Sequence, residues 1–142
     1  MIDQKAAPYA ALVLRVSLGL LFLAHSLLKL LVFTLPGTAG FFQSLGLPGW
    51  LAYVTACVEL TGGIALMAGF YARYVALGLI PILLGAIVTV HGANGWLFSA
   101  PGGGWEYPAF WAMTLVVQFL LGDGVWTLKQ SPALSSKLSH SV

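Results

Sequence analysis

Four long apolar segments dominate this sequence of 142 residues. A helix that crosses a bilayer needs about 20 mostly apolar residues, because the hydrocarbon core is about 30 Å thick. The four segments have about this length, and glycine, proline or charged residues separate them. The sequence therefore predicts four membrane-spanning helices, at about residues 9–31, 50–70, 71–90 and 108–126.

The composition supports the same fold class. Hydrophobic residues make up 59% of the chain and charged residues only 7%, whereas soluble domains usually carry about 25% charged residues. These values exclude a water-soluble enzyme, and the net charge of +2 is too small for a nucleic-acid partner. The single cysteine, Cys57, excludes an internal disulfide, and we expect it to be a small buried residue. We expect an all-α protein, an integral membrane four-helix bundle surrounded by lipid.

The positive charges predict an orientation, because Lys and Arg accumulate in the cytoplasmic loops of membrane proteins. In a four-span layout, only Lys29 among the Lys and Arg residues of the loops falls on the outer side. The others fall on the inner side: Lys5, Arg73, Lys129 and Lys137. Both termini should then be cytoplasmic, with an N-terminus at residues 1–8, a transmembrane domain at 9–128 and a disordered tail at 129–142.

Two connections on the outer side are longer than simple turns. Residues 32–49 are too apolar for a loop in water, and Pro-Gly pairs interrupt them on both sides. They predict a short helix that lies in the interface or dips into the bundle. Residues 91–107 contain three consecutive glycines as well as Trp96 and Trp105. This second connection predicts a flexible lid edged by interface anchors.

Spacing forces two charges into the membrane. Only 13 uncharged residues separate Glu59 from Arg73, and only ten separate it from Pro48, so neither stretch can span without Glu59. Glu59 should therefore lie near the middle of the second helix. Only 13 residues also separate Arg15 from Lys29, so at least one of these two must be within the membrane. We expect Arg15 to be the deeper one.

The burial of Glu59 has two interpretations. A charge at the centre of the bilayer costs about 2.5–3.5 kcal/mol on insertion scales, so an unpaired Glu59 that faces lipid is disfavoured. In the first interpretation, Arg15 pairs with Glu59 and fastens the first two helices together. In the second, Glu59 lines a polar cavity and takes up or releases a proton or a substrate. The sequence leaves both open.

The outer end of the layout brings several polar residues to a similar depth. His25, Lys29, His91 and Glu106 could form a vestibule above Glu59, or they could be ordinary residues at helix ends. The HxxxH and HExxH spacings are absent, so we expect no metal site. The catalytic residues, if any, are unknown. The candidate ligand-binding or intramembrane polar residues are Arg15, His25, Lys29, Glu59, His91 and Glu106.

Small and polar residues share one face on each of the first two helices. Such residues allow helices to approach closely in a membrane. On the first helix the face is Arg15, Gly19, Phe22, Ser26 and Lys29. On the second it is Thr55, Glu59, Gly62, Gly63 and Leu66. We therefore expect a compact bundle that encloses these faces.

From about residue 14 to residue 128, the chain resembles the DoxX family of small four-helix membrane proteins. The resemblance rests on the order and spacing of these segments: Leu14–Arg15, Gly19–Phe22, His25–Lys29, Glu59–Gly63, Gly69–Arg73, Val90–Gly92 and Glu106. Two positions depart from the family pattern. Ser26 stands where a glycine is usual, and Thr127–Lys129 stands where an aspartate is common near the end.

The resemblance implies a multi-pass protein of the bacterial or archaeal inner membrane. Some relatives are subunits or accessories of membrane redox systems, including those that oxidise thiosulfate or quinones, and the resemblance carries over Arg15, His25, Lys29 and Glu59 as recurrent polar positions. It favours an accessory, non-catalytic subunit of a membrane oxidoreductase system, with a polar intramembrane site at Arg15 and Glu59 that contacts a quinone-like molecule. Quinone is the implied cofactor, and we expect no covalently bound one. The implied partners are the lipid bilayer, membrane oxidoreductase subunits or further copies of the chain.

Two other functions remain open at this point. One is the binding or proton-coupled transport of a small solute, with Glu59 as the site beneath a lid formed by Trp96 and Trp105. The other is an assembly scaffold whose helix faces bind other membrane proteins. The lone cysteine and the lack of a haem or iron–sulfur ligand set argue against electron transfer by this chain alone.

Overall fold

The computed structural model describes residues 3–134, which form five α-helices and no β-strand. The helices are α1 (Ala7–Leu27), α2 (Leu35–Ser44), α3 (Trp50–Ala68), α4 (Ala72–Ala86) and α5 (Glu106–Leu121). Single π-helical segments, Leu28–Val32 and Ile87–His91, extend α1 and α4, and a 3₁₀ turn at Gly92–Asn94 follows the second. The predicted all-α class is confirmed. Residues 135–142 of the predicted disordered tail lie outside the described residues.

Three helical stretches are long and apolar enough to cross a membrane. They are Ala7–Val32, Trp50–Ala68 and Ala72–Asn94, with 26, 19 and 23 residues. The fourth predicted span, α5, is apolar but has only 16 residues, or about 24 Å. It ends at Leu121 and not near residue 126, because Gly122 and Gly124 adopt φ angles of 90° and 76°. These angles are incompatible with a right-handed helix.

The predicted helix in the first long connection is present as α2. Pro36 occupies one of its first positions, where the missing N–H of proline costs no helical hydrogen bond. The side chain of Thr34 accepts a hydrogen bond from the backbone N–H of Gly37 at 3.3 Å and so caps the helix. Apolar residues of α2, among them Phe41 and Phe42, face the rest of the molecule across a cavity described below.

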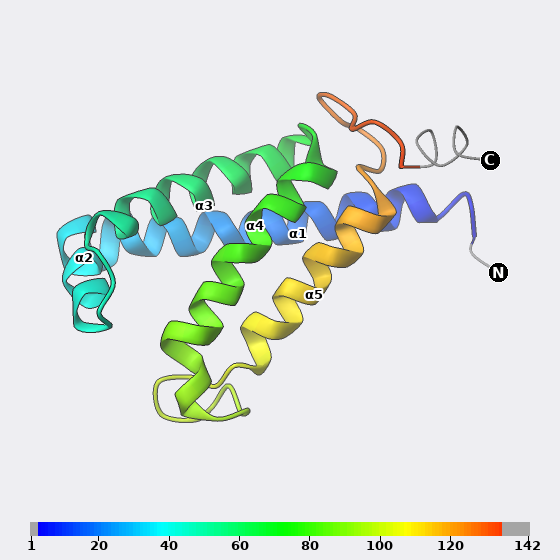
Figure 1. Cartoon of the computed structure of the whole chain (residues 1–142). Coiled ribbons are helices and arrows are strands. Elements are labelled where there is room, and N and C mark those ends of the chain that lie inside the picture. Colours follow the sequence, from blue (N-terminus) through cyan, green and yellow to red (C-terminus); the bar gives the residue numbers. More distant parts are fainter. Residues whose placement is uncertain (1–2, 135–142) are drawn as a thin grey trace, which may run out of the picture.

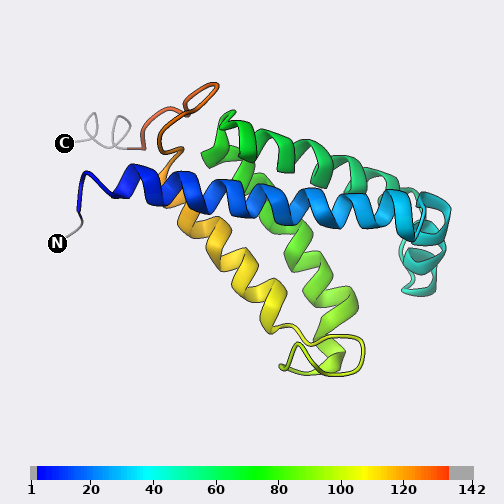
Figure 2. The same ribbon diagram turned by 180° about the vertical axis from the view of Figure 1, so that it is seen from behind.

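The four longer helices form two antiparallel pairs, α1 with α3 and α4 with α5 (Figure 1). The pairs meet where α1 begins and α3 turns into α4, and they diverge toward the opposite end, as the view from behind also shows (Figure 2). The short helix α2 lies at the diverging end of the first pair. This divergence places the candidate site between the two pairs.

The core lies where the two pairs meet. It joins residues from all four longer helices: Leu18, Phe22, Leu66, Ala72, Ala76, Leu79, Leu83, Trp111, Ala112 and Leu115. Within a bilayer, lipid tails are as apolar as these side chains, so the core stabilises the fold mainly by close packing. Three of the core residues are alanines, Ala72 and Ala76 on α4 and Ala112 on α5, and their small side chains allow α4 to approach its neighbours closely.

Glycine sets the close approach of α1 and α3. A Cβ atom added at Gly63 would lie 2.9 Å from the carbonyl oxygen of Gly19 and 3.0 Å from the backbone nitrogen of Leu23. The backbones therefore touch at this crossing. Nearby, the buried hydroxyl of Ser26 donates a hydrogen bond of 2.8 Å to the carbonyl of Ala56. The small-residue faces predicted for the first two helices are the surfaces that pack together.

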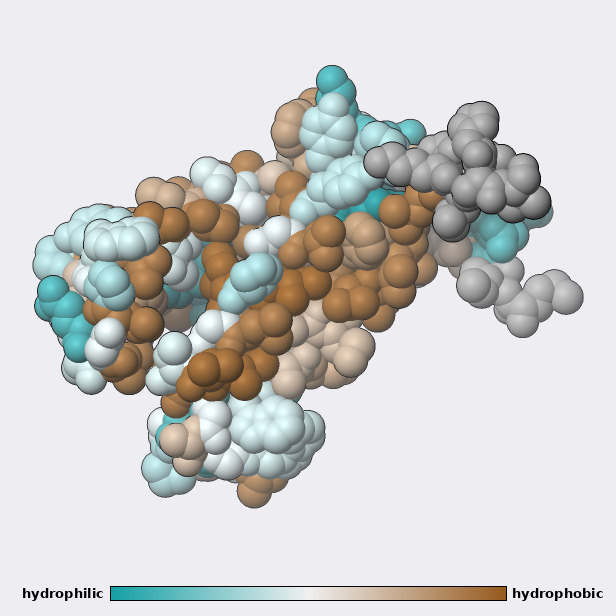
Figure 3. All heavy atoms as spheres, viewed as in Figure 1, coloured by the Kyte–Doolittle hydropathy of each residue, from teal (hydrophilic) through white to brown (hydrophobic). Residues whose placement is uncertain are grey.

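The outward faces of the helices are strongly apolar. Large hydrophobic side chains are exposed along them, including Leu20, Ile64, Leu77, Leu84, Val88, Phe110, Met113 and Leu120. Figure 3 shows hydrophobic residues across the middle of the molecule. A soluble monomer seldom exposes so much contiguous apolar surface, so this surface suits a lipid environment.

The predicted burial of Cys57 is wrong. Cys57 is exposed because it lies beside the face of α3 that packs on α1, and not on that face.

Asp123 connects the segment after α5 to the start of α4. Its carboxylate accepts hydrogen bonds from the backbone N–H of Arg73 at 2.7 Å, and from the backbone N–H and the hydroxyl of Ser131. A carboxylate in this position also interacts favourably with the positive end of the α4 dipole. The side chain is buried, with 7% of the residue exposed. Asp123 therefore acts as a helix cap supplied from a distant part of the chain.

Replacing Asp123 with alanine should lower the free energy of unfolding by about 1–2 kcal/mol, the usual cost of losing a helix cap. The loss is measured by unfolding the purified protein in mixed detergent micelles. Asp123→Asn serves as the control, because the amide oxygen keeps one acceptor for the N–H of Arg73 and the loss should be smaller. An alanine variant as stable as the unmodified protein would contradict the capping role.

Candidate ligand-binding cavity

A cavity of about 930 Å³ lies between the two helix pairs and α2. Its volume falls within the range of sites for small molecules, about 300–1,000 Å³. Figure 3 shows the surface hollowed between α2 and α4. Most of the lining is apolar, with side chains that include Leu28, Phe33, Phe41, Phe42, Leu51, Val58, Ile82, Leu83 and Val90. The few polar groups therefore decide what the cavity can recognise.

One ion pair lies in the cavity wall. The ammonium group of Lys29 donates to both carboxylate oxygens of Glu59, at 2.9 and 2.7 Å. The two side chains are 17% and 7% exposed, so little solvent screens their attraction. Lys29 follows α1 and Glu59 lies near the middle of α3, so the pair also joins these two helices. Among the described residues it is the single salt bridge.

Two histidines contribute the next polar groups. His25 lines the cavity from α1, and its Nδ1 lies 2.9 Å from the carbonyl oxygen of Leu21 one turn earlier. His91 lines it from the segment after α4, and its Nδ1 lies 2.8 Å from the carbonyl oxygen of Gly103. Each ring is therefore oriented by a backbone group. The histidines belong to different helix pairs and face one shared space.

Both extended helices widen into π-helical turns beside the cavity. Lys29 lies in the segment Leu28–Val32 and His91 in the segment Ile87–His91. Single π-helical turns within α-helices occur frequently at functional sites, because the extra residue redirects a side chain. The two turns therefore give Lys29 and His91 positions that a regular helix would not give them.

Trp111 packs aromatic groups together beside the cavity. Its ring centroid is 4.5 Å from that of Phe22, 4.9 Å from that of His25 and 5.7 Å from that of Tyr107. Such separations give favourable contacts between aromatic rings. Trp111 lines the cavity and is 5% exposed, and its indole N–H has no hydrogen-bond partner in the described part of the chain. This cluster joins α1 to α5 at the cavity.

Arg15 lies outside the cavity. All five of its N–H donors bind backbone carbonyl oxygens: Asp123 (3.0 Å), Leu66 (2.9 Å), Met67 (2.7 Å), Val125 (2.9 Å) and Trp126 (2.6 Å). Arg15 thus joins α1 to the end of α3 and to the segment after α5. Carbonyls at the end of a helix lack partners within that helix, and the guanidinium group supplies them here.

The predicted pair between Arg15 and Glu59 is therefore wrong. Because α1 and α3 are antiparallel, Arg15 faces the last turns of α3, while Lys29 lies about 21 Å further along α1. Glu59 precedes Met67 by eight residues, or about 12 Å along α3. Lys29 therefore pairs with the carboxylate of Glu59, and Arg15 donates hydrogen bonds to backbone carbonyls at the end of α3. The three glycines near these carbonyls, Gly69, Gly122 and Gly124, were the available signal of an irregular backbone there.

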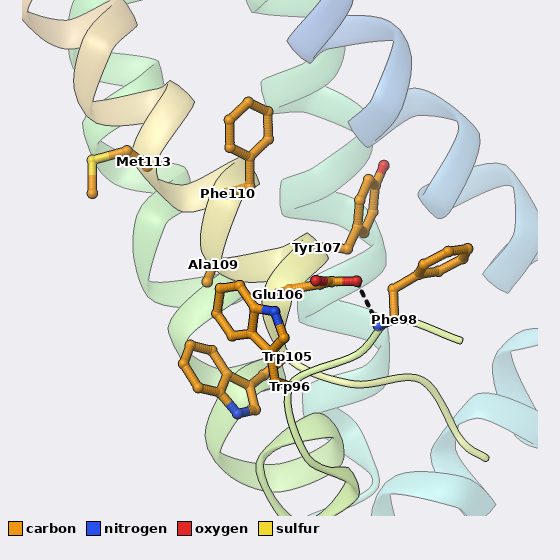
Figure 4. A pocket seen from close by; sticks show the side chains of 8 residues that line it. All are labelled: Trp96, Phe98, Trp105, Glu106, Tyr107, Ala109, Phe110 and Met113. Carbon is orange, nitrogen blue, oxygen red and sulfur yellow. Dashed lines mark hydrogen bonds between the residues drawn. The ribbon is translucent and has the colours of Figure 1, made fainter. Parts of the chain in front are cut away.

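Glu106 also lies outside the cavity. Its carboxylate accepts a hydrogen bond from the backbone N–H of Phe98 at 2.7 Å and lines a second pocket of about 580 Å³ (Figure 4).

The two tryptophans predicted as a lid lie at this second pocket. Trp96 and Trp105, with ring centroids 4.5 Å apart, line it and do not line the cavity that holds Glu59. The lid that Trp96 and Trp105 were predicted to form over Glu59 is therefore absent. Backbone hydrogen bonds such as Trp105 N–H to the Gly95 carbonyl, at 3.0 Å, close the loop on itself.

Four of the six predicted site residues meet in the cavity: His25, Lys29, Glu59 and His91. Sequence reasoning missed Tyr107 and Trp111, whose aromatic side chains also line it. In the sequence, an aromatic residue that lines a cavity looks the same as one that packs in the core or faces lipid. Within residues 3–134, no group of three or more His, Cys, Asp or Glu side chains could hold a metal ion.

These features define the class as a small all-helical membrane protein with an apolar cavity that contains an ion pair. The chain belongs to the DoxX family, whose model matches residues 10–92, and the predicted resemblance is confirmed. The matched segment contains His25, Lys29, Glu59 and His91 of the cavity, whereas Tyr107 and Trp111 lie beyond it.

The chain is also similar to a curated protein of Bacillus subtilis (strain 168) named "Putative oxidoreductase CatD". The two are 41% identical over 87 residues, which make up 61% of this chain and 63% of that protein. The match thus spans less than two thirds of the length of the relative. No solved structure matches the chain significantly.

Proposed function

We propose that this protein is an accessory subunit of a redox system in the bacterial or archaeal inner membrane, and that it binds a molecule of the quinone class in its cavity. The observation that carries the proposal is the Lys29–Glu59 ion pair in the wall of an otherwise apolar space. A cavity of this kind suits an amphipathic ligand with a few polar atoms on an apolar body. The name of the Bacillus relative supports a link to redox chemistry.

The donor set of the cavity fits a quinone ring. The ammonium of Lys29 has three N–H donors and gives two of them to Glu59, so one remains for a ligand oxygen. Glu59 fixes the position of this donor, and the aromatic ring of Trp111 offers a flat apolar surface. The apolar walls exclude water and strengthen each polar contact. When bound, a quinone supplies the capacity to carry two electrons and two protons.

The proposed membrane placement has four spans, with α5 as the shortest, and both termini on the cytoplasmic side. Arg73 and Lys129 lie at the same end of the molecule, where the N–H of Tyr71 donates to the carbonyl of Lys129 at 2.9 Å. α1 begins at this end too (Figure 1). Positive residues at one end favour the cytoplasmic side for that end. The cavity and α2 then lie toward the outer half of the bilayer.

Binding is tested with the purified protein in nanodiscs of synthetic lipid and with tritiated decylubiquinone as the probe. Protein-dependent, saturable retention of the probe supports the proposal, after subtraction of empty nanodiscs. The double variant Lys29→Met/Glu59→Gln should weaken binding about tenfold or more, because it removes the polar contact and leaves no unpaired charge. Glu106→Gln is the matched control, since this carboxylate lies outside the cavity, and it should bind normally. Equal binding by the double variant contradicts the proposal.

The accessory role needs a separate test. Protein purified from its native membrane in a mild detergent should carry a membrane oxidoreductase subunit with it, identified by mass spectrometry. Extraction of the same sample should yield quinone in proportion to the protein. Recovery of a homo-oligomer without redox partner and without quinone would remove the accessory role.

A further inference from the structure

His25 and His91 use the same ring nitrogen to contact the backbone. In each ring, Nδ1 lies within 2.9 Å of a carbonyl oxygen, that of Leu21 or that of Gly103. A carbonyl oxygen can only accept a hydrogen bond, so Nδ1 must carry the hydrogen in both rings. In a neutral imidazole, a hydrogen on Nδ1 leaves a lone pair on Nε2. In their neutral form, both histidines therefore have Nε2 as an acceptor.

Neither Nε2 atom has a hydrogen-bond partner in the described part of the chain. The Nδ1 of His25 bonds to its own helix, so the opposite side of that ring is directed away from the α1 backbone. The Nδ1 of His91 bonds to the loop at Gly103, which leaves Nε2 on the side of the ring away from that contact. Both residues line the cavity. The cavity thus gains one unpartnered acceptor from each helix pair.

These two acceptors affect which ligand can satisfy all the hydrogen-bonding groups of the cavity. The ion pair provides one spare N–H donor, since both oxygens of Glu59 already accept from Lys29. The imidazoles provide two acceptors. A quinone carries two carbonyl oxygens, which only accept hydrogen bonds, so it would leave both imidazoles unsatisfied. A hydroquinone carries two hydroxyl groups, each of which can donate to one Nε2, and one of the two can also accept from the spare N–H of Lys29.

We infer that the cavity binds the hydroquinone form of its ligand more tightly than the quinone form, and that His25 and His91 determine this preference. The inference rests on the proposed function and specifies the redox state of the ligand at the same site. Each hydroxyl that donates to an otherwise unsatisfied imidazole contributes a hydrogen bond that the quinone cannot form. For two such bonds, the expected preference is about tenfold or more.

The experiment compares decylubiquinone with its reduced form, decylubiquinol, on the purified protein in nanodiscs under anaerobic conditions. Each bound probe is extracted and quantified by chromatography. The dissociation constant of the reduced probe should be about tenfold lower than that of the oxidised probe. His25→Phe and His91→Phe keep an aromatic ring but remove the acceptor. Each should reduce the ratio of the two dissociation constants, and the double variant should bring it close to one.

The possible outcomes distinguish a failure of the redox preference from a failure of the proposed quinone binding. If neither probe binds, the proposed function fails and the inference fails with it. If the oxidised probe binds as tightly as the reduced one, or more tightly, the inference is overturned and the proposed function stands. If the preference persists in the double histidine variant, the assignment to His25 and His91 is overturned.

Discussion

Replacing Arg15 with leucine should lower the free energy of unfolding by at least about 3 kcal/mol. The guanidinium group donates to five backbone carbonyls, and a hydrogen bond to a charged group contributes about 1.5–3 kcal/mol. Leucine removes all five bonds and leaves buried carbonyls of Leu66 and Asp123 with fewer partners. Unfolding in mixed detergent micelles, followed by circular dichroism, measures the loss.

Arg15→Lys distinguishes the shape of the donor group from its charge. A lysine keeps the positive charge but has only three N–H donors on one nitrogen, so it cannot reach five carbonyls from two segments. We expect a loss of stability intermediate between the unmodified protein and Arg15→Leu. The cavity lies away from Arg15, so any Arg15→Lys protein that folds should still bind the quinone probe. A fully stable Arg15→Leu protein would show that the five contacts do not hold the fold.

Adding one methyl group at Gly63 should destabilise the protein by about 1–3 kcal/mol, as overpacking of a tight contact typically does. The new Cβ atom would meet backbone atoms of Gly19 and Leu23 at 2.9 and 3.0 Å, and backbone cannot rotate aside. α1 and α3 would have to separate. The measurement is again unfolding in mixed micelles, for Gly63→Ala against the unmodified protein.

Gly78→Ala is the matched control for this substitution. It adds the same methyl group to an α-helix, but nothing lies within 4 Å of the new atom. The higher helix propensity of alanine should leave stability unchanged or slightly raised. If both variants were equally destabilised, the effect would come from a general cost of the added methyl group, such as an altered lipid contact, and not from the crossing of α1 and α3.

The sequence predicted the burial of Glu59 because spacing alone excludes any span without it. It could not select the partner, since Arg15 and Lys29 share one face of the first helix and both are cations. The choice depends on where backbone carbonyls are available to Arg15: some lie at the end of α3, and the others lie in the segment after α5, far along the chain. The glycines at 69, 122 and 124 indicate an irregular backbone, but they do not show which side chain its carbonyls will bind.

The apolar content of residues 32–49 was sufficient to predict α2, because a helix is the natural way to satisfy the backbone in apolar surroundings. The predicted end of α5 was wrong because the apolar residues Val125 and Trp126 were counted with the helix, although Gly122, Asp123 and Gly124 interrupt the hydrophobic run and end the helix before them. The cavity was not predictable in shape. It arises from the angle between the two helix pairs, which depends on tertiary packing at the end where they meet.

The divergence of the helix pairs determines how a ligand would arrive. Their outward faces are apolar, so the route to the hollow between α2 and α4 passes through surroundings that resemble acyl chains. A hydrophobic molecule partitions into those chains before it meets the protein. Its effective concentration is then its mole fraction in the bilayer, and diluting the sample with water at a fixed ratio of ligand to lipid should leave occupancy unchanged.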